Sequence, residues 1–260
     1  MQFCSKWFSD YKELPNILRF HFYDRLLPLL YPRHCPVCGS VLPYGSYICE
    51  KCAPELPYVR EPICLSCGKP VASSEQEYCY DCRIFPKRFR ASRALFIYND
   101  KTRPAMTAFK YKNRRVLSPF FAREICARHA GTIFRWKPDL LVPVPIHKNK
   151  RRLRGYNQAA LLAQDLSALL HIPCCSNLLL RCIDTPPQKA LRPQARLNNL
   201  LDAFTINPAC QKQLAGVSTV LLIDDIYTTG ATMEICTRIL HAAGVKNVYI
   251  YSVCIGIARD

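Results

Sequence analysis

Four Cys-x-x-Cys pairs fall within one short span of the chain and constrain its folding more than any other sequence feature. They contain eight of the sixteen cysteines: Cys35, Cys38, Cys49, Cys52, Cys64, Cys67, Cys79 and Cys82. Two residues between cysteines let a tight turn aim both sulfurs at one ion, and two such pairs complete a tetrahedral zinc site. The spacing therefore predicts two Zn2+ sites, formed by either sequential or cross-braced pairing.

The segment that carries these pairs, residues 33–85, is rich in Pro and Gly and too loop-rich for a hydrophobic core of its own. Metal binding would supply the missing folding energy. A site with four cysteine ligands is closed and keeps no open position for a substrate, so both zinc ions are expected to be structural.

The remaining eight cysteines are scattered, several within apolar runs, which is typical of buried free thiols in a reducing compartment. The amino terminus has no signal-peptide pattern, and no run reaches the roughly 18 apolar residues of a membrane helix. These features predict a cytoplasmic protein without membrane insertion.

Apolar runs and amphipathic segments alternate after the cysteine span. Strands are predicted over residues 94–98, 140–144, 220–223 and 248–254, and helices over 156–170 and 232–242, with two further helical stretches between 99 and 138. Strands that alternate with helices indicate an α/β fold with a mostly parallel sheet flanked by helices. The predicted organisation is a helical segment (1–32), a double zinc-ribbon module (33–85) and an α/β domain (86–260).

The net charge of +17 is concentrated in residues 83–154, which contain 20 Lys or Arg and only three acids; 16 of the 36 bases and 16 of the 19 acids lie outside it. Such a field attracts anions, either a phosphorylated small molecule or nucleic acid; the alternative is a solvated basic surface. Interleaved with these cations are Phe85, Phe89, Phe96, Tyr98, Phe109 and Tyr111. Cations and aromatic rings together fit a groove for single-stranded DNA, unless the rings belong to the core.

Residues 220–233 combine an apolar strand, two acids, a Thr/Gly loop and the start of a helix. At the carboxyl end of a parallel strand, loop amides and a helix amino terminus surround an anion such as phosphate. Carboxylates pointing at that phosphate would repel it. Asp224 and Asp225 are therefore expected to accept hydrogen bonds from a diol, as on a ribose ring.

This run resembles the signature of type I phosphoribosyltransferases. The matching residues are Asp224, Asp225, Thr228, Thr229, Gly230, Ala231 and Thr232. The resemblance implies a phosphoribosyltransferase-like sheet that binds phosphoribosyl pyrophosphate (PRPP), with the acids on the ribose hydroxyls and the loop on the 5′-phosphate. It also implies Mg2+ bridging the pyrophosphate and the sugar.

Two further segments, residues 142–158 and 185–204, extend the likeness to the ComF (ComFC) family, which is associated with natural competence. By position in the related transferases, Arg151, Arg152 and Arg154 are candidates for the pyrophosphate side, and Lys189, Arg192 and Arg196 for a lid. If transfer chemistry occurs, the resemblance makes Asp224, Asp225 and Arg192 the candidate catalytic residues. No nucleobase hood is recognisable.

Three functions fit these motifs. The first is a DNA-handling competence protein that binds single-stranded DNA and uses PRPP, or a related ribose phosphate, as substrate or regulator. The second is an active phosphoribosyltransferase with an unknown nitrogen acceptor, and the third a PRPP-sensing module that recruits a partner. The sequence has no Gly-x4-Gly-Lys-Thr motif. Energy for DNA movement would therefore come from a partner such as the competence helicase.

Overall fold

The computed structural model describes residues 32–43, 45–183 and 203–257. The chain divides into two compact units, Met1–Leu56 and Pro57–Asp260. Within the first unit the structure describes the first pair of cysteine knuckles and a short 3-10 helix, η3 (Ala53–Glu55). The second unit contains the second pair of knuckles together with the α/β sheet. Most of the predicted helical segment 1–32 lies outside the described residues.

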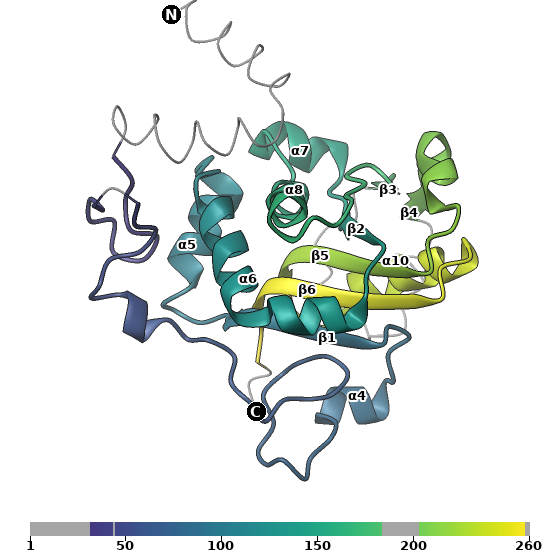
Figure 1. The fold of residues 1–260 in the computed structure, drawn as a ribbon, viewed down its shortest axis with the longest axis horizontal. Coiled ribbons are helices and arrows are strands. Elements are labelled where there is room, and N and C mark those ends of the chain that lie inside the picture. Colours follow the sequence, from purple (N-terminus) through teal and green to yellow (C-terminus); the bar gives the residue numbers. More distant parts are fainter. Residues whose placement is uncertain (1–31, 44, 184–202, 258–260) are drawn as a thin grey trace, which may run out of the picture. The chain divides into compact units, whose positions relative to one another are not determined.

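A four-stranded parallel sheet forms the centre of the second unit (Figure 1). Its strand order is β1 (Ala91–Ile97), β6 (Asn247–Ile255), β5 (Thr219–Tyr227) and β2 (Leu140–Pro143). All three pairings are parallel, so the predicted α/β class with a mostly parallel sheet is confirmed. The two central strands are the longest, and most of their residues are buried, as expected for apolar runs covered on both faces.

Helices connect the strands and cover both faces of the sheet. They are α5 (Arg103–Tyr111), α6 (Leu117–Trp136), α7 (Lys148–Arg154), α8 (Gln158–Leu170) and α10 (Ala231–Ala242). The α8 helix packs against β2 and β5, and α6 packs against α8, whereas α10 packs against β6. None of the helices in the described residues is long and apolar enough to cross a membrane.

Smaller elements complete the second unit. They are the short helix α4 (Tyr80–Ile84), the 3-10 helix η4 (Pro208–Leu214) and an antiparallel pair formed by β3 (Leu179–Arg181) and β4 (Phe204–Ile206). The β4 strand also contacts α10. This pair lies on either side of the stretch 184–202, which is outside the described residues.

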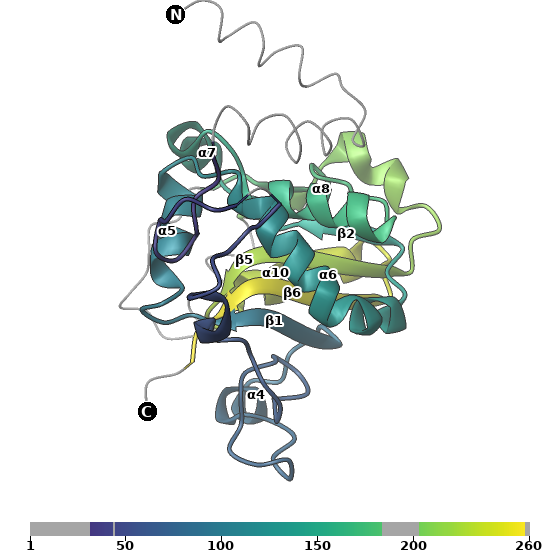
Figure 2. The same ribbon diagram turned by 60° about the vertical axis from the view of Figure 1, so that its left-hand side comes forward.

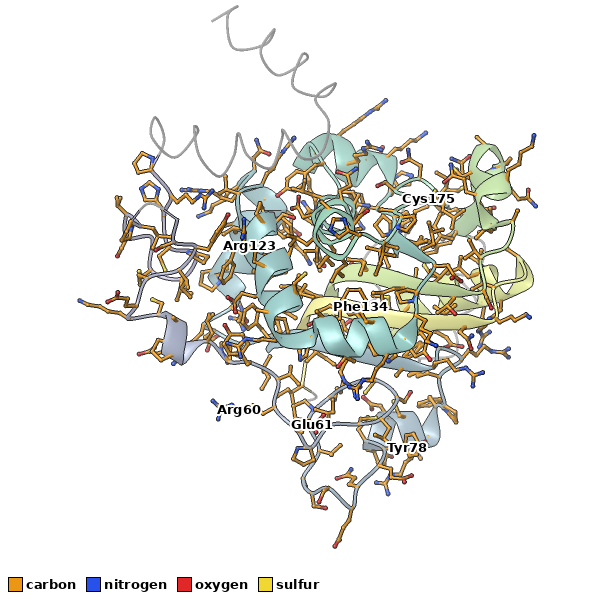
Figure 3. All side chains as sticks on the ribbon, in the orientation of Figure 1. Arg60, Glu61, Tyr78, Arg123, Phe134 and Cys175 are labelled. Carbon is orange, nitrogen blue, oxygen red and sulfur yellow. The ribbon has the colours of Figure 1, made fainter. Side chains whose placement is uncertain are left out.

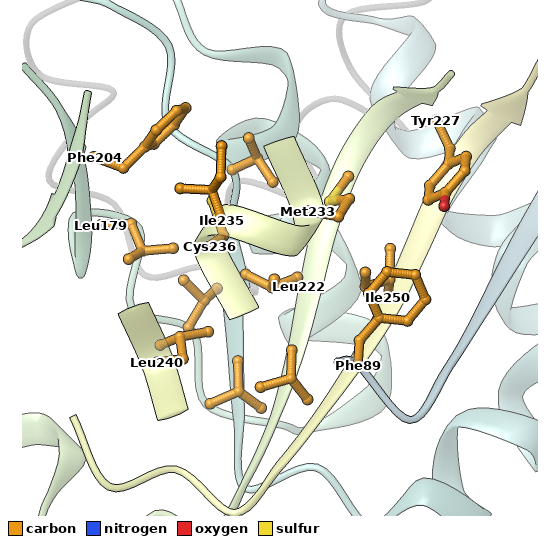
Figure 4. Packing of buried hydrophobic residues seen from close by; sticks show 14 of the residues in the cluster. Phe89, Leu179, Phe204, Leu222, Tyr227, Met233, Ile235, Cys236, Leu240 and Ile250 are labelled. Atoms are coloured by element: carbon orange, nitrogen blue, oxygen red, sulfur yellow. The ribbon is translucent and has the colours of Figure 1, made fainter. Parts of the chain in front are cut away.

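The core on one face of the sheet is built by alternation along β5. Val220 and Leu222 are fully buried and share a cluster with Ile235, Cys236 and Leu240 of α10 (Figure 4). Successive side chains of a strand point to opposite faces. The buried residues between them therefore face the opposite side of the sheet, where α8 and α6 pack.

The basic span is only partly the aromatic groove that its sequence suggests. Phe89, Phe96 and Phe109 are each at most 3% exposed and belong to the core. Phe96 on β1 and Phe109 on α5 both pack against Phe121 of α6, and Phe89, just before β1, packs against Tyr227. Phe85 and Tyr111, by contrast, are 46% and 61% exposed.

Exposed aromatic rings are not confined to the basic span. Tyr78, beside the second pair of knuckles, lies outside that span and is also exposed (Figure 3). An exposed ring alone therefore does not mark a nucleic-acid surface in this protein; an exposed ring beside exposed cations is the more specific feature.

The free edge of β1 is covered by the second ribbon. The Ser92 N–H donates to the Ser66 carbonyl at 2.7 Å, and the Val59 N–H donates to the Leu95 carbonyl at 3.0 Å. The loops that carry α4 lie beyond β1 in both views of the ribbon (Figure 2). Because an uncovered edge strand leaves unpaired backbone groups, the ribbon completes the sheet as well as binding metal.

Two equivalent glycines provide a test of this docking. Gly39 and Gly68 follow the first knuckle of each ribbon with φ near +77°, but only Gly68 would place a Cβ 2.6 Å from the Ser92 carbonyl oxygen, while Gly39 has open space. Left-handed backbone costs an L-residue about 1–2 kcal/mol. Gly39→Ala should cost about that much, and Gly68→Ala should cost at least about 3 kcal/mol because the backbone clash is added. Chemical denaturation of the zinc-loaded variants measures the difference, and equal losses would contradict the docking.

Candidate phosphate and zinc sites

The two acids lie on β5, the strand between β6 and β2, near its carboxyl end. The strand continues past the predicted end at residue 223, because pairing with β6 persists through Asp224, Ile226 and Tyr227. The loop of Thr228, Thr229 and Gly230 then leads into α10. The carboxyl ends of parallel strands, next to a helix amino terminus, are where open α/β sheets bind ligands.

Asp225 forms an ion pair with a lysine that sequence analysis did not single out. Lys110 Nζ lies 3.0 Å from Asp225 Oδ1, and the two side chains are 19% and 12% exposed. Burial is the largest single influence and would lower the pKa of Lys110, but the charge and hydrogen bond of Asp225, together with Asp224, raise it overall. Lys110 comes from the last turn of α5, so this helix supplies a permanent positive charge to the acids.

Asp224 is in a different electrostatic state from its neighbour. Burial and the adjacent Asp225 carboxylate raise the pKa of Asp224 to about 8, against the opposing hydrogen bond from the Asp225 N–H (2.8 Å) and the charges of Lys110 and Arg154. Near neutral pH Asp224 therefore keeps its proton beside the Lys110–Asp225 ion pair. The charges of the site nearly cancel before any ligand is present.

The loop after β5 has the features of an anion site. Thr228 and Thr229 are exposed, and Gly230 adopts φ +78° directly before Ala231, the first residue of α10. Among the described residues no side chain caps this end of α10, and the only acid in its first turn is Glu234. Its amide groups and dipole are thus available to a phosphate, with the Thr232 hydroxyl in the same turn.

The basic segment after β2 is divided between the site and the surface. Arg154, at the end of α7, is half-buried, donates to Gln158 Oε1 (3.1 Å) and the Tyr111 hydroxyl (3.3 Å), and acts electrostatically on Asp224. Arg151 and Arg152 are exposed on the same helix. Of these three candidates for the pyrophosphate side, the structure brings Arg154 within electrostatic reach of the acids.

The candidate lid residues Lys189, Arg192 and Arg196 lie outside the described residues. Their assignment, including that of Arg192 as a candidate catalytic residue, stays a prediction.

The eight paired cysteines form two separate clusters in sequential order. One contains Cys35, Cys38, Cys49 and Cys52; the other contains Cys64, Cys67, Cys79 and Cys82. Within each cluster the sulfurs lie within 4.8 Å of one another. The cross-braced alternative is therefore excluded.

Both clusters fit tetrahedral zinc. A tetrahedron with Zn–S bonds of about 2.3 Å separates its sulfurs by about 3.8 Å. The Cys38 and Cys49 sulfurs are 3.7 Å apart, and those of Cys67 and Cys79 are 3.5 Å apart. Four cysteines fill each coordination shell, so the zinc would hold the ribbon loops together rather than act on a substrate.

Comparison with known proteins supports this combination. The family model for a double zinc ribbon domain matches residues 26–83. Competence protein ComFC of Bacillus subtilis is 30% identical to the chain over 76% of the chain and 79% of its own length. The chain belongs to the ComF family.

Other ComF-like relatives match at comparable levels. Competence protein F of Haemophilus influenzae is 28% identical over 83% of this chain and 98% of its own length. DNA utilization protein YhgH of Escherichia coli K12 is 27% identical over 87% of this chain and 98% of its own length. Both matches are longer than either compact unit, so the likeness to these relatives extends into both units.

The raised pKa of Asp224 predicts how this ComF protein responds to pH. Between about pH 4 and pH 8 the folded state holds a proton that the unfolded chain has released, so the contribution of Asp224 to stability falls as pH rises through this window. Asp224→Asn keeps a carbonyl acceptor for the Asp225 N–H and removes the titration. Its stabilising effect should therefore grow by about 3 kcal/mol between pH 5 and pH 8.

Urea denaturation of the variant and the wild type at the two pH values measures this difference. Asp100→Asn is the control, because that side chain is 91% exposed. A gain from Asp224→Asn that is the same at both pH values would show that Asp224 is already ionised in the folded protein.

Proposed function

We propose that this ComF-family protein acts in competence-type DNA utilisation and binds PRPP, or a related ribose phosphate, at the carboxyl end of β5. The observation that carries the proposal is the joining of two adjacent acids, of which Asp225 is buried and Asp224 half-buried, to an uncapped helix terminus by a three-residue loop. The acids suit a diol and the helix terminus suits a phosphate. A ribose 5-phosphate carries both of these groups close together. The names of the relatives supply the DNA-related process.

Each group in the site would take one part of the ligand. The loop from Thr228 to Thr232 would hold the 5′-phosphate through backbone and hydroxyl donors. Asp224 and Asp225 would accept hydrogen bonds from the ribose hydroxyls. Arg154, with Arg151 at the rim, would face the pyrophosphate, and Mg2+ bound with PRPP would neutralise part of its charge.

Lys110 makes this arrangement possible. Two adjacent carboxylates next to a phosphate would otherwise repel it by several kcal/mol at short range and low dielectric. The ion pair with Lys110 and the proton on Asp224 leave the acids close to neutral, so they can accept or donate hydrogen bonds without a strong repulsive field.

Calorimetric titration with PRPP and Mg2+ tests the site. The double variant Asp224→Ala/Asp225→Ala should lose affinity for PRPP by at least about 100-fold, because it loses the hydrogen bonds of both acids to the diol, including the charge-assisted one to Asp225. Inorganic pyrophosphate has no ribose, so its binding should not weaken in the same variant. The exposed Asp100→Ala variant should bind both ligands like the wild type.

A wild type that ignores PRPP would overturn the proposal. An equal loss of pyrophosphate binding in the double variant would show that the acids support the fold rather than the ribose. Release of pyrophosphate on addition of a nitrogen acceptor would extend the function to phosphoribosyl transfer, whereas PRPP-dependent changes in DNA or partner affinity without turnover would indicate a sensor.

We also propose that single-stranded DNA binds along the surface of α7 and the end of α5. Five of the seven residues of α7 are Lys or Arg, and no acid is among them. Lys112, Arg114 and the exposed ring of Tyr111 follow directly at the end of α5, and Arg154 of α7 stacks over that ring. Cations that track a backbone, with a ring on which a base can stack, are the elements of a single-strand site.

This DNA surface predicts a specific salt dependence. For single strands, log K changes with log salt by about −0.7 per neutralised phosphate, so Lys148→Gln/Arg152→Gln should reduce the slope by about 1.4. The control Lys212→Gln/Lys246→Gln removes the same amount of charge at exposed positions away from α7: Lys212 lies in η4 and Lys246 directly before β6. Fluorescence anisotropy with a poly-dT oligonucleotide measures both, and equal slopes in the two double variants would contradict the location. Movement of the strand would require energy from a partner such as a helicase.

A further inference from the structure

Tyr227 is a buried side chain whose polar end is unexplained by the fold. It is the last residue of β5, directly before the phosphate loop, and is 2% exposed. Its hydroxyl has no hydrogen-bond partner among the described residues. An unpaired buried hydroxyl costs about 1–3 kcal/mol. Such a group therefore suggests a hydrogen bond that forms only when an ion or ligand is bound.

The hydroxyl end of the Tyr227 ring leaves no room for a side chain at Gly230 in the loop. A Cβ on Gly230 would lie 2.2 Å from the Tyr227 hydroxyl oxygen and 2.6 Å from Cζ. Gly230 also has φ +78°, where residues with a side chain are strained. The ring therefore lies directly against the backbone of the loop and fixes its path into α10.

Both the backbone and the ring of Tyr227 are held in place. The Tyr227 carbonyl accepts a hydrogen bond from the Gly256 N–H at 2.8 Å, and the Phe89 ring packs edge-on against the Tyr227 ring, with 6.5 Å between the ring centroids (Figure 4). Neither of these two contacts involves the hydroxyl. They hold Tyr227 in place but leave its hydroxyl without a hydrogen-bond acceptor among the described residues.

The other neighbours of Tyr227 are the second set of cysteines. Tyr227 shares a core cluster with Cys64, Cys67 and Cys82, and the sulfurs of that set act electrostatically on its hydroxyl. With zinc bound these cysteines are thiolates, which accept hydrogen bonds far better than thiols. Groups that donate to metal ligands commonly tune the affinity of the metal.

We propose that Tyr227 is a positioning residue that joins the second zinc site to the phosphate loop. Its ring supports Gly230, and its hydroxyl donates to a cysteine thiolate of the Cys64–Cys82 set when zinc is bound. The role of the hydroxyl at the zinc site is independent of any ligand, whereas the role of the ring in ligand binding rests on the proposed function. The first cysteine set, Cys35 to Cys52, belongs to the other compact unit and is not part of this core cluster.

Tyr227→Phe and Tyr227→Leu separate these two roles. Phe keeps the ring and removes the hydroxyl, so it should release zinc from the second site at least 10-fold faster while binding PRPP within threefold of the wild type at saturating zinc. Leu removes the support under Gly230 as well and should weaken PRPP binding at least 10-fold.

Zinc release is measured with a chromogenic chelator in full-length protein carrying Cys38→Ser, so that the intact second site gives the signal. An unchanged release rate in Tyr227→Phe overturns the hydroxyl role. The ring role is overturned if Tyr227→Leu binds PRPP like the wild type.

Hydrogen exchange keeps the inference testable if the wild type does not bind PRPP. Removal of the second zinc should speed exchange of the amides of residues 228–232 at least 10-fold, and removal of the first zinc through Cys38→Ser should leave them unchanged. Equal protection with and without the second zinc would overturn the link, independently of any ligand. A wild type that shows the exchange response but no PRPP binding would refute the proposed function and keep the inference.

Discussion

Two adjacent and largely desolvated acids near the end of β5 are the constraint on which the site depends. The chain could place apolar residues there, as it does along the rest of β5, and avoid the cost of desolvating charge. Instead it supplies Lys110 from α5 and holds Asp224 protonated near neutral pH. An arrangement that lowers stability and needs a dedicated counter-charge is typical of a functional site.

Packing and sequence repetition group the zinc ribbons differently. The repeated knuckles pair the two ribbons in sequence, and one family model spans both. In space the second ribbon belongs to the compact unit of the sheet, where it covers the edge of β1 and contributes cysteines to the core. A Cys4 site that binds no substrate can thus still influence a ligand loop, because Tyr227, which contacts Gly230 of that loop, belongs to the same core cluster as its cysteines.

Local patterns made much of this structure predictable. Strand and helix positions followed from apolar periodicity, and the composition of the zinc sites followed from Cys-x-x-Cys spacing. The roles of Lys110 and Tyr227 did not follow, because each depends on a contact between segments far apart in sequence. Lys110 looks like the other nineteen cations of its span. Similarly, only the fold shows that Phe89 and Phe109 are core residues while Tyr111 is exposed.

The cations of the basic span differ in burial, and burial determines what each can do. Lys110 is largely desolvated, so its charge acts strongly on one partner at close range and is poorly screened by salt. Arg154 is intermediate and is oriented by two hydrogen bonds. The exposed cations of α7 act mainly through a screened, long-range field, which suits a phosphate backbone more than one small ligand. A single basic sequence segment can therefore serve both a specific ribose-phosphate site and a non-specific strand surface.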